Sequence, residues 1–132
     1  MLLEALIGIL IFSLGILALV GMQAIAVRLS TDARDRAEAA NLASQLVGDM
    51  WTNRAILATY AYDGTGTPPA PLQDWVAKVE ASLPDADDNP PTITLAPSAL
   101  GASVGTETTI VLRWRNPSET SVHRFVMTAY IN

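Results

Sequence analysis

Hydrophobic residues fill the beginning of the chain almost without interruption. From Ala5 to Met22 the only side chain with a hydrogen-bonding group is Ser13. As a helix, the stretch from Met1 to Val27 spans roughly 40 Å, which exceeds the ~30 Å hydrocarbon core of a bilayer. No basic segment precedes this stretch and no small-residue cleavage site follows it, so we expect no cleavage after the apolar run. The pattern predicts one helix of membrane-spanning length.

After Val27 the sequence becomes charged and alanine-rich, and it contains no proline before Pro68. The helix is therefore expected to continue as an amphipathic one and to end, after about 55 residues, before the glycine- and proline-rich residues 60–71. Three- and four-residue spacings predict that its buried stripe consists of Leu29, Ala33, Ala37, Ala40, Ala43, Val47 and Met50. The other faces are expected to carry Asp32, Asp35, Arg36 and Glu38.

Shorter elements are predicted beyond this loop. Residues 72–84 indicate a short helix that ends at Pro84, with Leu72, Trp75, Val76, Val79 and Leu83 on one stripe. Residues 92–97 suggest a short strand. Residues 107–115 and 121–131 are rich in β-branched and aromatic side chains and predict an antiparallel hairpin, turning at Asn116, Pro117 and Ser118. Its core-facing residues are expected to be Ile110, Leu112 and Trp114, with Phe125, Met127, Ala129 and Ile131.

These elements define an α+β fold. A long N-terminal helix, apolar in its first half and amphipathic in its second, carries a small head with a short helix and an antiparallel hairpin or small sheet. A two-stranded hairpin is marginal by itself, so it should pack on the amphipathic helix. We expect a transmembrane or filament-core helix over residues 1–27, and the amphipathic continuation with the head over residues 28–132.

Composition removes several functional classes. The chain of 132 residues has a net charge of −5 and no cysteine. An acidic chain lacks a general attraction to phosphates, so nucleic acid is not an expected partner. The absence of cysteine excludes disulfides, thiolate zinc sites and cysteine nucleophiles.

Few side chains suggest chemistry. A solitary His123 on a strand is more often solvent-facing than a ligand or base. Ser118 and Ser121 show no nucleophile pattern. The aspartates of residues 85–88 lack the spacing of a calcium loop and are expected to form a solvated turn, with weak cation binding as the alternative. We therefore predict no catalytic residue, no metal site and no cofactor, and we do not expect an enzyme.

Glu4 requires an explanation, because a carboxylate at the edge of an apolar run is costly to bury without a partner. It either remains solvated at a membrane surface or meets a positive group on assembly, such as an α-amino terminus. The three arginines of the hairpin, Arg113, Arg115 and Arg124, are expected to contact acidic residues such as Asp32 or Glu38 of another subunit.

The segment LLEALIGILIFSLGILALVGMQ resembles the mature N-terminus of type IV pilins, whose leader is removed just before such a segment. The following AEAANLASQLVGDMWTNR, with Asp49, Met50, Asn53 and Arg54, is similar to the minor-pilin family called type IV pilus modification protein PilV. The Trp75 helix and TTIVLRWRN also fit that family. Glu4 lies one position earlier than the family pattern, which implies that Met1 corresponds to the second mature residue. Gly21, where major pilins usually have a proline, points to a minor pilin or pseudopilin.

The resemblance implies a structural subunit of a type IV pilus-like extracellular filament, a fimbrium associated with adhesion and motility. Prepilin peptidase would process and methylate the terminus, and the pilus assembly machinery would move the chain from the inner membrane into a filament with like or other pilin subunits. Glu4 and Met1 would serve assembly, and the filament core would contain Leu6, Ile9, Phe12, Gly15, Leu19 and Gly21. The alternatives are a minor pseudopilin of type II secretion and a single-span periplasmic binding or interaction protein.

Overall fold

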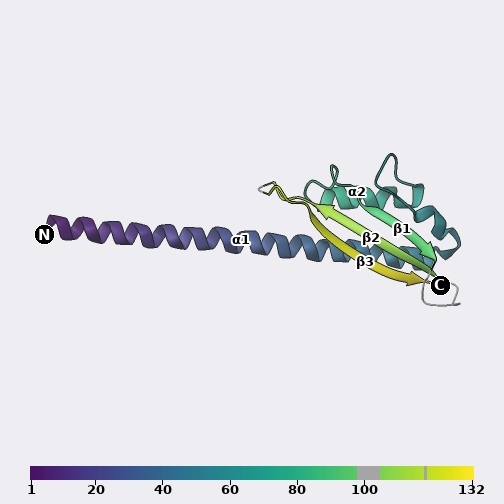
Figure 1. Ribbon diagram of the computed structural model, residues 1–132, viewed down its shortest axis with the longest axis horizontal. Coiled ribbons are helices and arrows are strands. Elements are labelled where there is room, and N and C mark those ends of the chain that lie inside the picture. The colour runs from purple at the N-terminus through teal and green to yellow at the C-terminus, as the bar shows by residue number, and fades with distance from the viewer. Residues whose placement is uncertain (98–104, 118) are drawn as a thin grey trace. The chain divides into compact units, whose positions relative to one another are not determined.

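The computed structural model describes residues 1–97, 105–117 and 119–132. Helix α1 (Leu2–Thr52) is followed by two 3₁₀ helices, η1 (Arg54–Tyr60) and η2 (Ala70–Leu72), and by helix α2 (Gln73–Ser82). Three strands follow, namely β1 (Thr92–Pro97), β2 (Thr106–Trp114) and β3 (His123–Ile131), as Figure 1 shows. The predicted α+β class, with a long N-terminal helix, a short helix and a small antiparallel sheet, is confirmed.

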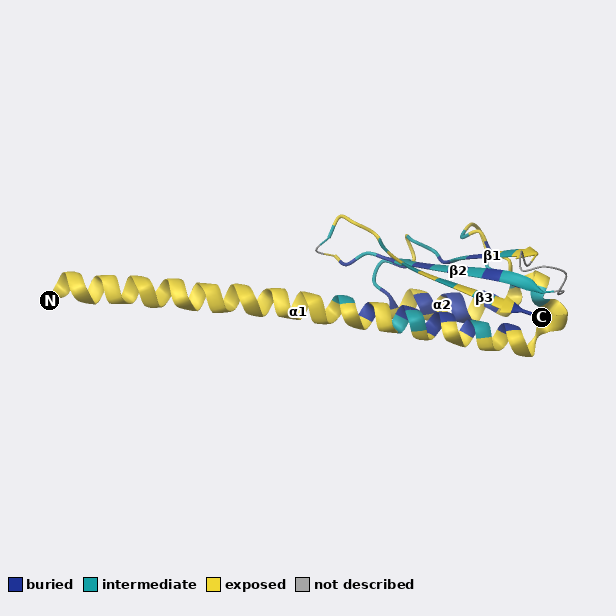
Figure 2. Ribbon diagram, turned by 60° about the horizontal axis from the view of Figure 1, so that its bottom comes forward, coloured by how far each residue is buried: buried dark blue, intermediate teal, exposed yellow. Residues whose placement is uncertain are grey.

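The chain divides into two compact units, Met1–Asp35 and Arg36–Asn132, which we call the apolar unit and the globular unit. The apolar unit consists almost entirely of the first part of α1, and every residue from Met1 to Thr31 in it is exposed (Figure 2). The globular unit contains the rest of α1 and all other elements.

Within the globular unit, strands β1, β2 and β3 form a sheet in that order, and both pairs are antiparallel. Ile93 lies opposite Ile110, and Ile110 lies opposite Met127, so one row of apolar side chains crosses the sheet. From Glu107 onward burial alternates along β2, where Ile110, Leu112 and Trp114 are buried as predicted. Of the β3 residues predicted to face the core, Ile131 is buried and Phe125, Met127 and Ala129 are partly buried.

The core of the globular unit lies between this sheet and the two helices, and α2 supplies the predicted stripe. Leu72, Trp75, Val76, Val79 and Leu83 are all buried. The indole Nε1 of Trp75 donates a buried hydrogen bond to the Leu42 carbonyl at 2.9 Å, which ties α2 to α1. The helix ends at Ser82, and the Leu83 amide still donates to the Val79 carbonyl. Pro84 cannot continue it.

The stripe predicted for the second half of α1 was wrong in part. Its buried residues are Asp35, Ala39, Leu42, Ala43, Leu46 and Met50, whereas Leu29, Ala33 and Ala37 are exposed and Ala40 and Val47 are half-buried. Asp35 was expected on a solvated face and is only 8 % exposed. Alanines at helical spacing made several stripes almost equally apolar, and the larger Leu42 and Leu46 decide which one is buried because they remove more apolar surface from water.

Candidate functional site

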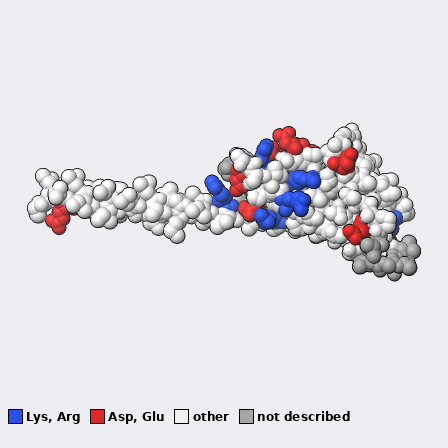
Figure 3. Space-filling model, in the orientation of Figure 1, with Lys and Arg blue, Asp and Glu red and all other residues white. Residues whose placement is uncertain are grey.

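The apolar unit presents hydrophobic side chains on every side of its helix. The predicted filament-core residues Leu6, Ile9, Phe12 and Leu19 are each at least 60 % exposed. A Cβ added at Gly15 or Gly21 would meet no atom within 4 Å apart from the neighbouring backbone of its own helix. Figure 3 shows this surface as almost free of charge. Because a helix that is hydrophobic all round requires an apolar environment, this surface is the main candidate site.

This helix is long and apolar enough to cross a membrane. Its one hydroxyl between Ala5 and Met22 is satisfied locally, because Ser13 Oγ donates to the Ile9 carbonyl at 2.7 Å. At the end of the run, Thr31 Oγ1 donates in the same way to the Val27 carbonyl. Such internal bonds remove the cost of placing a hydroxyl in lipid or against other apolar helices.

Glu4 and Met1 lie at the exposed start of this helix. Glu4 occupies the first turn of α1, and the Ala5 amide bonds to the Met1 carbonyl at 3.2 Å. A carboxylate in the first turn interacts favourably with the helix dipole. The carboxylate is the only acidic group before Asp32, so it marks one end of an uncharged stretch that reaches Arg28.

The three arginines of the hairpin lie in different environments. Arg115 forms an ion pair with Asp85 at 2.7 Å, within its own chain. Arg113 donates to the Pro90 carbonyl at 3.3 Å and is half-buried, whereas Arg124 is exposed directly opposite it on β3. Basic side chains gather over the end of β2 and the start of β3 (Figure 3).

The sequence predicts a solvated turn at Asp85, Asp87 and Asp88, but in the structure this turn also makes contacts within the globular unit. Asp85 adopts a left-handed backbone with φ of 58° and accepts hydrogen bonds from Asn89 as well as from Arg115. Its carboxylate thus links this turn to Arg115, which directly follows β2. Among the described residues there is no group of three or more histidine, cysteine or acidic side chains that could hold a metal ion.

His123 is not solvent-facing, which corrects the expectation from sequence. Its ring stacks on the buried Trp114 with centroids 5.7 Å apart, and its Nε2 contacts the carboxylate of Glu119. Trp114 and His123 are cross-strand partners, and Glu119 belongs to the turn that joins β2 to β3. The register of the hairpin, which sets Trp114 opposite His123, brings these three side chains together.

Of the turn residues, Ser118 lies outside the described residues, as do most of the glycine-rich residues 99–105.

The residues Asp49, Met50, Asn53 and Arg54, which carry part of the family resemblance, have structural contacts. Met50 is fully buried, and the Asp49 carbonyl accepts both the backbone and the side-chain N–H of Asn53 at 3.0 Å, at the end of α1. Arg54 lies over the Trp51 ring at 5.8 Å and donates to the Asn132 carbonyl at 2.8 Å. These residues end the long helix and attach the last described residue to it.

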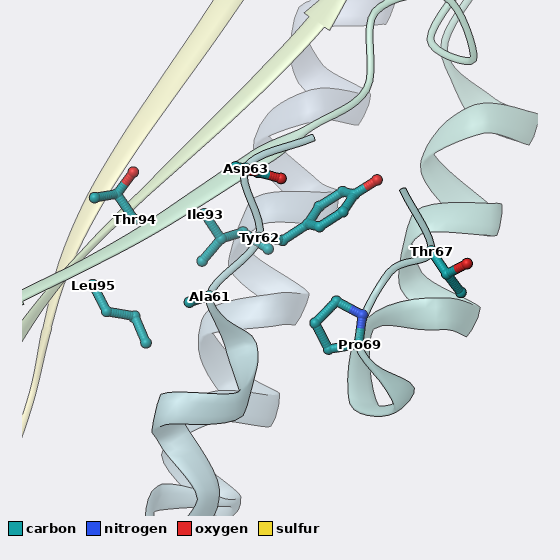
Figure 4. A pocket seen from close by; sticks show the side chains of 8 residues that line it. All are labelled: Ala61, Tyr62, Asp63, Thr67, Pro69, Ile93, Thr94 and Leu95. Carbon is teal, nitrogen blue, oxygen red and sulfur yellow. The ribbon is translucent and has the colours of Figure 1, made fainter. Parts of the chain in front are cut away.

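An open cavity of about 560 Å³ lies between β1 and the loop that follows η1, where Tyr62, Asp63, Thr67 and Thr94 line it (Figure 4). The loop is closed by Asp63, whose Oδ1 accepts from the Thr65 hydroxyl at 2.7 Å and the Thr65 amide at 2.9 Å. The Thr65 hydroxyl, followed by its amide, holds the pKa of Asp63 below its ordinary value. The cavity therefore has a permanent negative charge at its rim at neutral pH.

No protein-family model, curated protein or solved structure matches this chain.

Proposed function

We propose that this chain is a structural subunit of a type IV pilus-like filament. The observation that carries the proposal is the apolar unit, whose side chains are exposed on all sides over more than the width of a hydrocarbon core. Lipid covers such a surface in a membrane, and a bundle of equivalent apolar helices covers it in a filament.

The globular unit supports the same proposal. Its buried core begins at Ala39 and includes residues of α1, α2 and all three strands, so it is packed without help from the apolar unit. A folded unit with its own core can sit on the outside of a filament while the apolar helices associate. By resemblance, prepilin peptidase and the pilus assembly machinery act on the chain, and no catalysis is proposed.

Glu4 supplies the proposed contact between subunits. Its carboxylate would pair with the α-amino terminus of a neighbouring or the same chain, because an apolar filament core offers no water to solvate it. A single-span periplasmic binding protein is the second candidate, and the open cavity beside Tyr62 and Asp63 favours it.

The variant Glu4→Ala tests the proposal in cells that produce the filament. The amount of chain in the membrane fraction is expected to stay unchanged, because the apolar run is intact. The amount in the sheared surface fraction should fall by about tenfold or more, the effect of losing a contact of ~1.4 kcal/mol. Ser13→Ala is the matched control, since the Ser13 hydroxyl bonds only within its own helix in this structure.

Normal amounts of Glu4→Ala chain in the sheared fraction would contradict the charge pairing. Wild-type chain found only in the membrane fraction would instead favour the single-span binding protein.

A further inference from the structure

Strand β3 forms one edge of the sheet, and the hydrogen-bond pattern identifies which of its backbone groups point outward. Ile93 of β1 exchanges both of its backbone hydrogen bonds with Tyr62, on the side away from β2. Because antiparallel ladders alternate, the odd-numbered residues of β2 bond to β1 and the even-numbered ones bond to β3. In β3 the odd-numbered residues then bond to β2. The outward amides and carbonyls belong to Arg124, Val126, Thr128 and Tyr130.

Within the described residues, this edge lacks the proline and the bridging segment that protect the opposite edge of the sheet. The other edge strand, β1, is covered at Ile93 by Tyr62 and ends in Pro97, which has no N–H to donate. By contrast, the nine residues of β3 contain no proline, and the described part of the chain places no further strand beside it. Val126 and Tyr130 are 43 % and 45 % exposed.

The two ends of this edge differ in charge: two arginines meet at one end, and a tyrosine and a glutamate meet at the other. At the start of β3, Arg124 lies opposite Arg113, and two like charges in directly opposed positions are unfavourable. At its other end, Tyr130 lies opposite Glu107 on the same face of the sheet. The Glu107 carboxylate, as hydrogen-bond acceptor and then as a nearby negative charge, raises the pKa of Tyr130.

We propose that β3 pairs antiparallel with β3 of a second copy of this chain, about a two-fold axis at Met127. In this register Arg124 lies opposite Tyr130 of the other copy, and Val126 lies opposite Thr128. All four outward-pointing residues then form hydrogen-bonded pairs. Arg124 covers the partner's tyrosine ring and reaches toward the partner's Glu107, which gives the unfavourable arginine pair an acidic neighbour.

Other arrangements of two β3 strands satisfy fewer groups. A shift of the antiparallel register by two residues leaves one outward residue of each strand unpaired and separates Arg124 from Tyr130. A parallel, in-register arrangement places Arg124 beside its own copy, so like charges meet. Both the backbone and the charges therefore select the same register.

This contact goes beyond the proposed filament and does not depend on it. A two-fold interface is closed, so it joins two chains and does not propagate. Subunits of one helical filament are related by a rotation combined with a rise along its axis, and a two-fold rotation is not such an operation. The proposed partner is therefore a chain outside the same filament.

The full chain in detergent micelles, cross-linked through introduced cysteines, tests the pairing. Met127→Cys should form a disulfide-linked dimer under mild oxidation, because Met127 meets its own copy at the axis and the chain has no other cysteine. Thr109→Cys, in the middle of the same sheet on β2, is the matched control and should stay monomeric on a denaturing gel. This cross-link distinguishes pairing through β3 from association of the apolar helices.

Reversing the charge of Arg124 provides a second test of the β3 pairing. Arg124→Glu should weaken dimerisation, measured by sedimentation of Met127→Cys chains under reducing conditions and by their rate of cross-linking, by about tenfold or more. Adding Glu107→Arg should restore it, because the opposite charges then meet again. Lys78→Glu makes the same change of charge on α2 and should have no effect. No cross-link at Met127→Cys, or a cross-link that Arg124→Glu leaves unchanged in folded protein, would overturn the proposal.

Discussion

At two places where regular secondary structure ends, one polar side chain forms a hydrogen bond with the nearby backbone. Asn53 bonds to the Asp49 carbonyl at the end of α1, and Asp63 bonds to Thr65 in the loop after η1. Asp63 is followed by Gly64, whose φ of 86° favours glycine. Each of these contacts is local in sequence, so the residue types alone indicate a turn there.

The contact between Asp63 and Thr65 predicts a measurable titration. In Thr65→Val the hydroxyl donor is lost, so the pKa of Asp63 should rise toward the ordinary value of about 3.9. Thr65→Ser retains the hydroxyl and should keep the pKa low. NMR titration of the Asp63 carboxyl carbon measures both variants, and an unchanged pKa in Thr65→Val would contradict the assigned cause.

The sign of the effect on stability follows from this direction. The pKa of Asp63 is lower in the folded chain than in the unfolded chain, so its stabilising contribution is complete above the unfolded value. The contribution is lost as the pH falls through the folded value. Acid should therefore loosen the loop of residues 63–65 in the wild type more than in Thr65→Val.

At the scale of elements, patterns with large side chains were predicted well. The stripe on α2 and the inward face of β2 both contain tryptophan, and both are buried as expected. The alanine-rich part of α1 was predicted poorly, because its small side chains do not distinguish one face from another. His123 and Asp85 were misjudged since their partners lie across the hairpin or across a turn, which periodicity does not report.

Helix α1 has no break between Leu2 and Thr52 in this structure, although Gly15 and Gly21 weaken its helix propensity by roughly 1 kcal/mol each relative to alanine. In lipid an unpaired amide is too costly, so the helix is expected to remain intact there. In an assembled filament we predict that the backbone between Gly15 and Gly21 is extended, with neighbouring subunits covering it.

A density map of the filament tests this prediction. A gap in helical hydrogen bonding confined to this stretch would support it, and continuous bonding from Ala5 through Leu46 would refute it. The double variant Gly15→Ala and Gly21→Ala should keep the helix closed, because alanine has the higher helix propensity. The added methyl groups fit, since each meets no atom of the single chain beyond its own helix backbone. Gly8→Ala serves as the control outside the stretch.

At the scale of the whole molecule, the chain combines an apolar unit that has no core with a globular unit that has one. A chain that begins at Arg28 is therefore expected to fold in water, since every residue of the core cluster lies at Ala39 or later. It should show a cooperative transition in urea by circular dichroism. A disordered spectrum in native buffer would show that the globular unit depends on the apolar one.

Within this shortened chain, Trp75→Ala should lower the free energy of unfolding by about 3–5 kcal/mol, because it removes a large buried side chain. It also removes the bond from Nε1 to the Leu42 carbonyl. Glu80→Ala, on the exposed face of the same helix, should change the free energy by about 0.5 kcal/mol or less.

The candidate site was accessible from sequence because it rests on composition: an unbroken apolar run needs no tertiary contact to be recognised. The edge of β3 was not accessible in this way. Its outward amides follow from the strand order and from the bridge between Tyr62 and Ile93, and neither is encoded in a local pattern.

The central claim is that the apolar helix lies inside a filament, and labelling of introduced cysteines in sheared surface material tests it most directly. The chain has no cysteine, so Phe12→Cys and Asp87→Cys each carry one reactive thiol, on the apolar unit and on an exposed turn of the globular unit. With a membrane-impermeant maleimide, Asp87→Cys should react in intact filaments, and Phe12→Cys should react only after denaturation. Equal reaction at both positions, or the absence of both chains from the sheared material, would contradict the account.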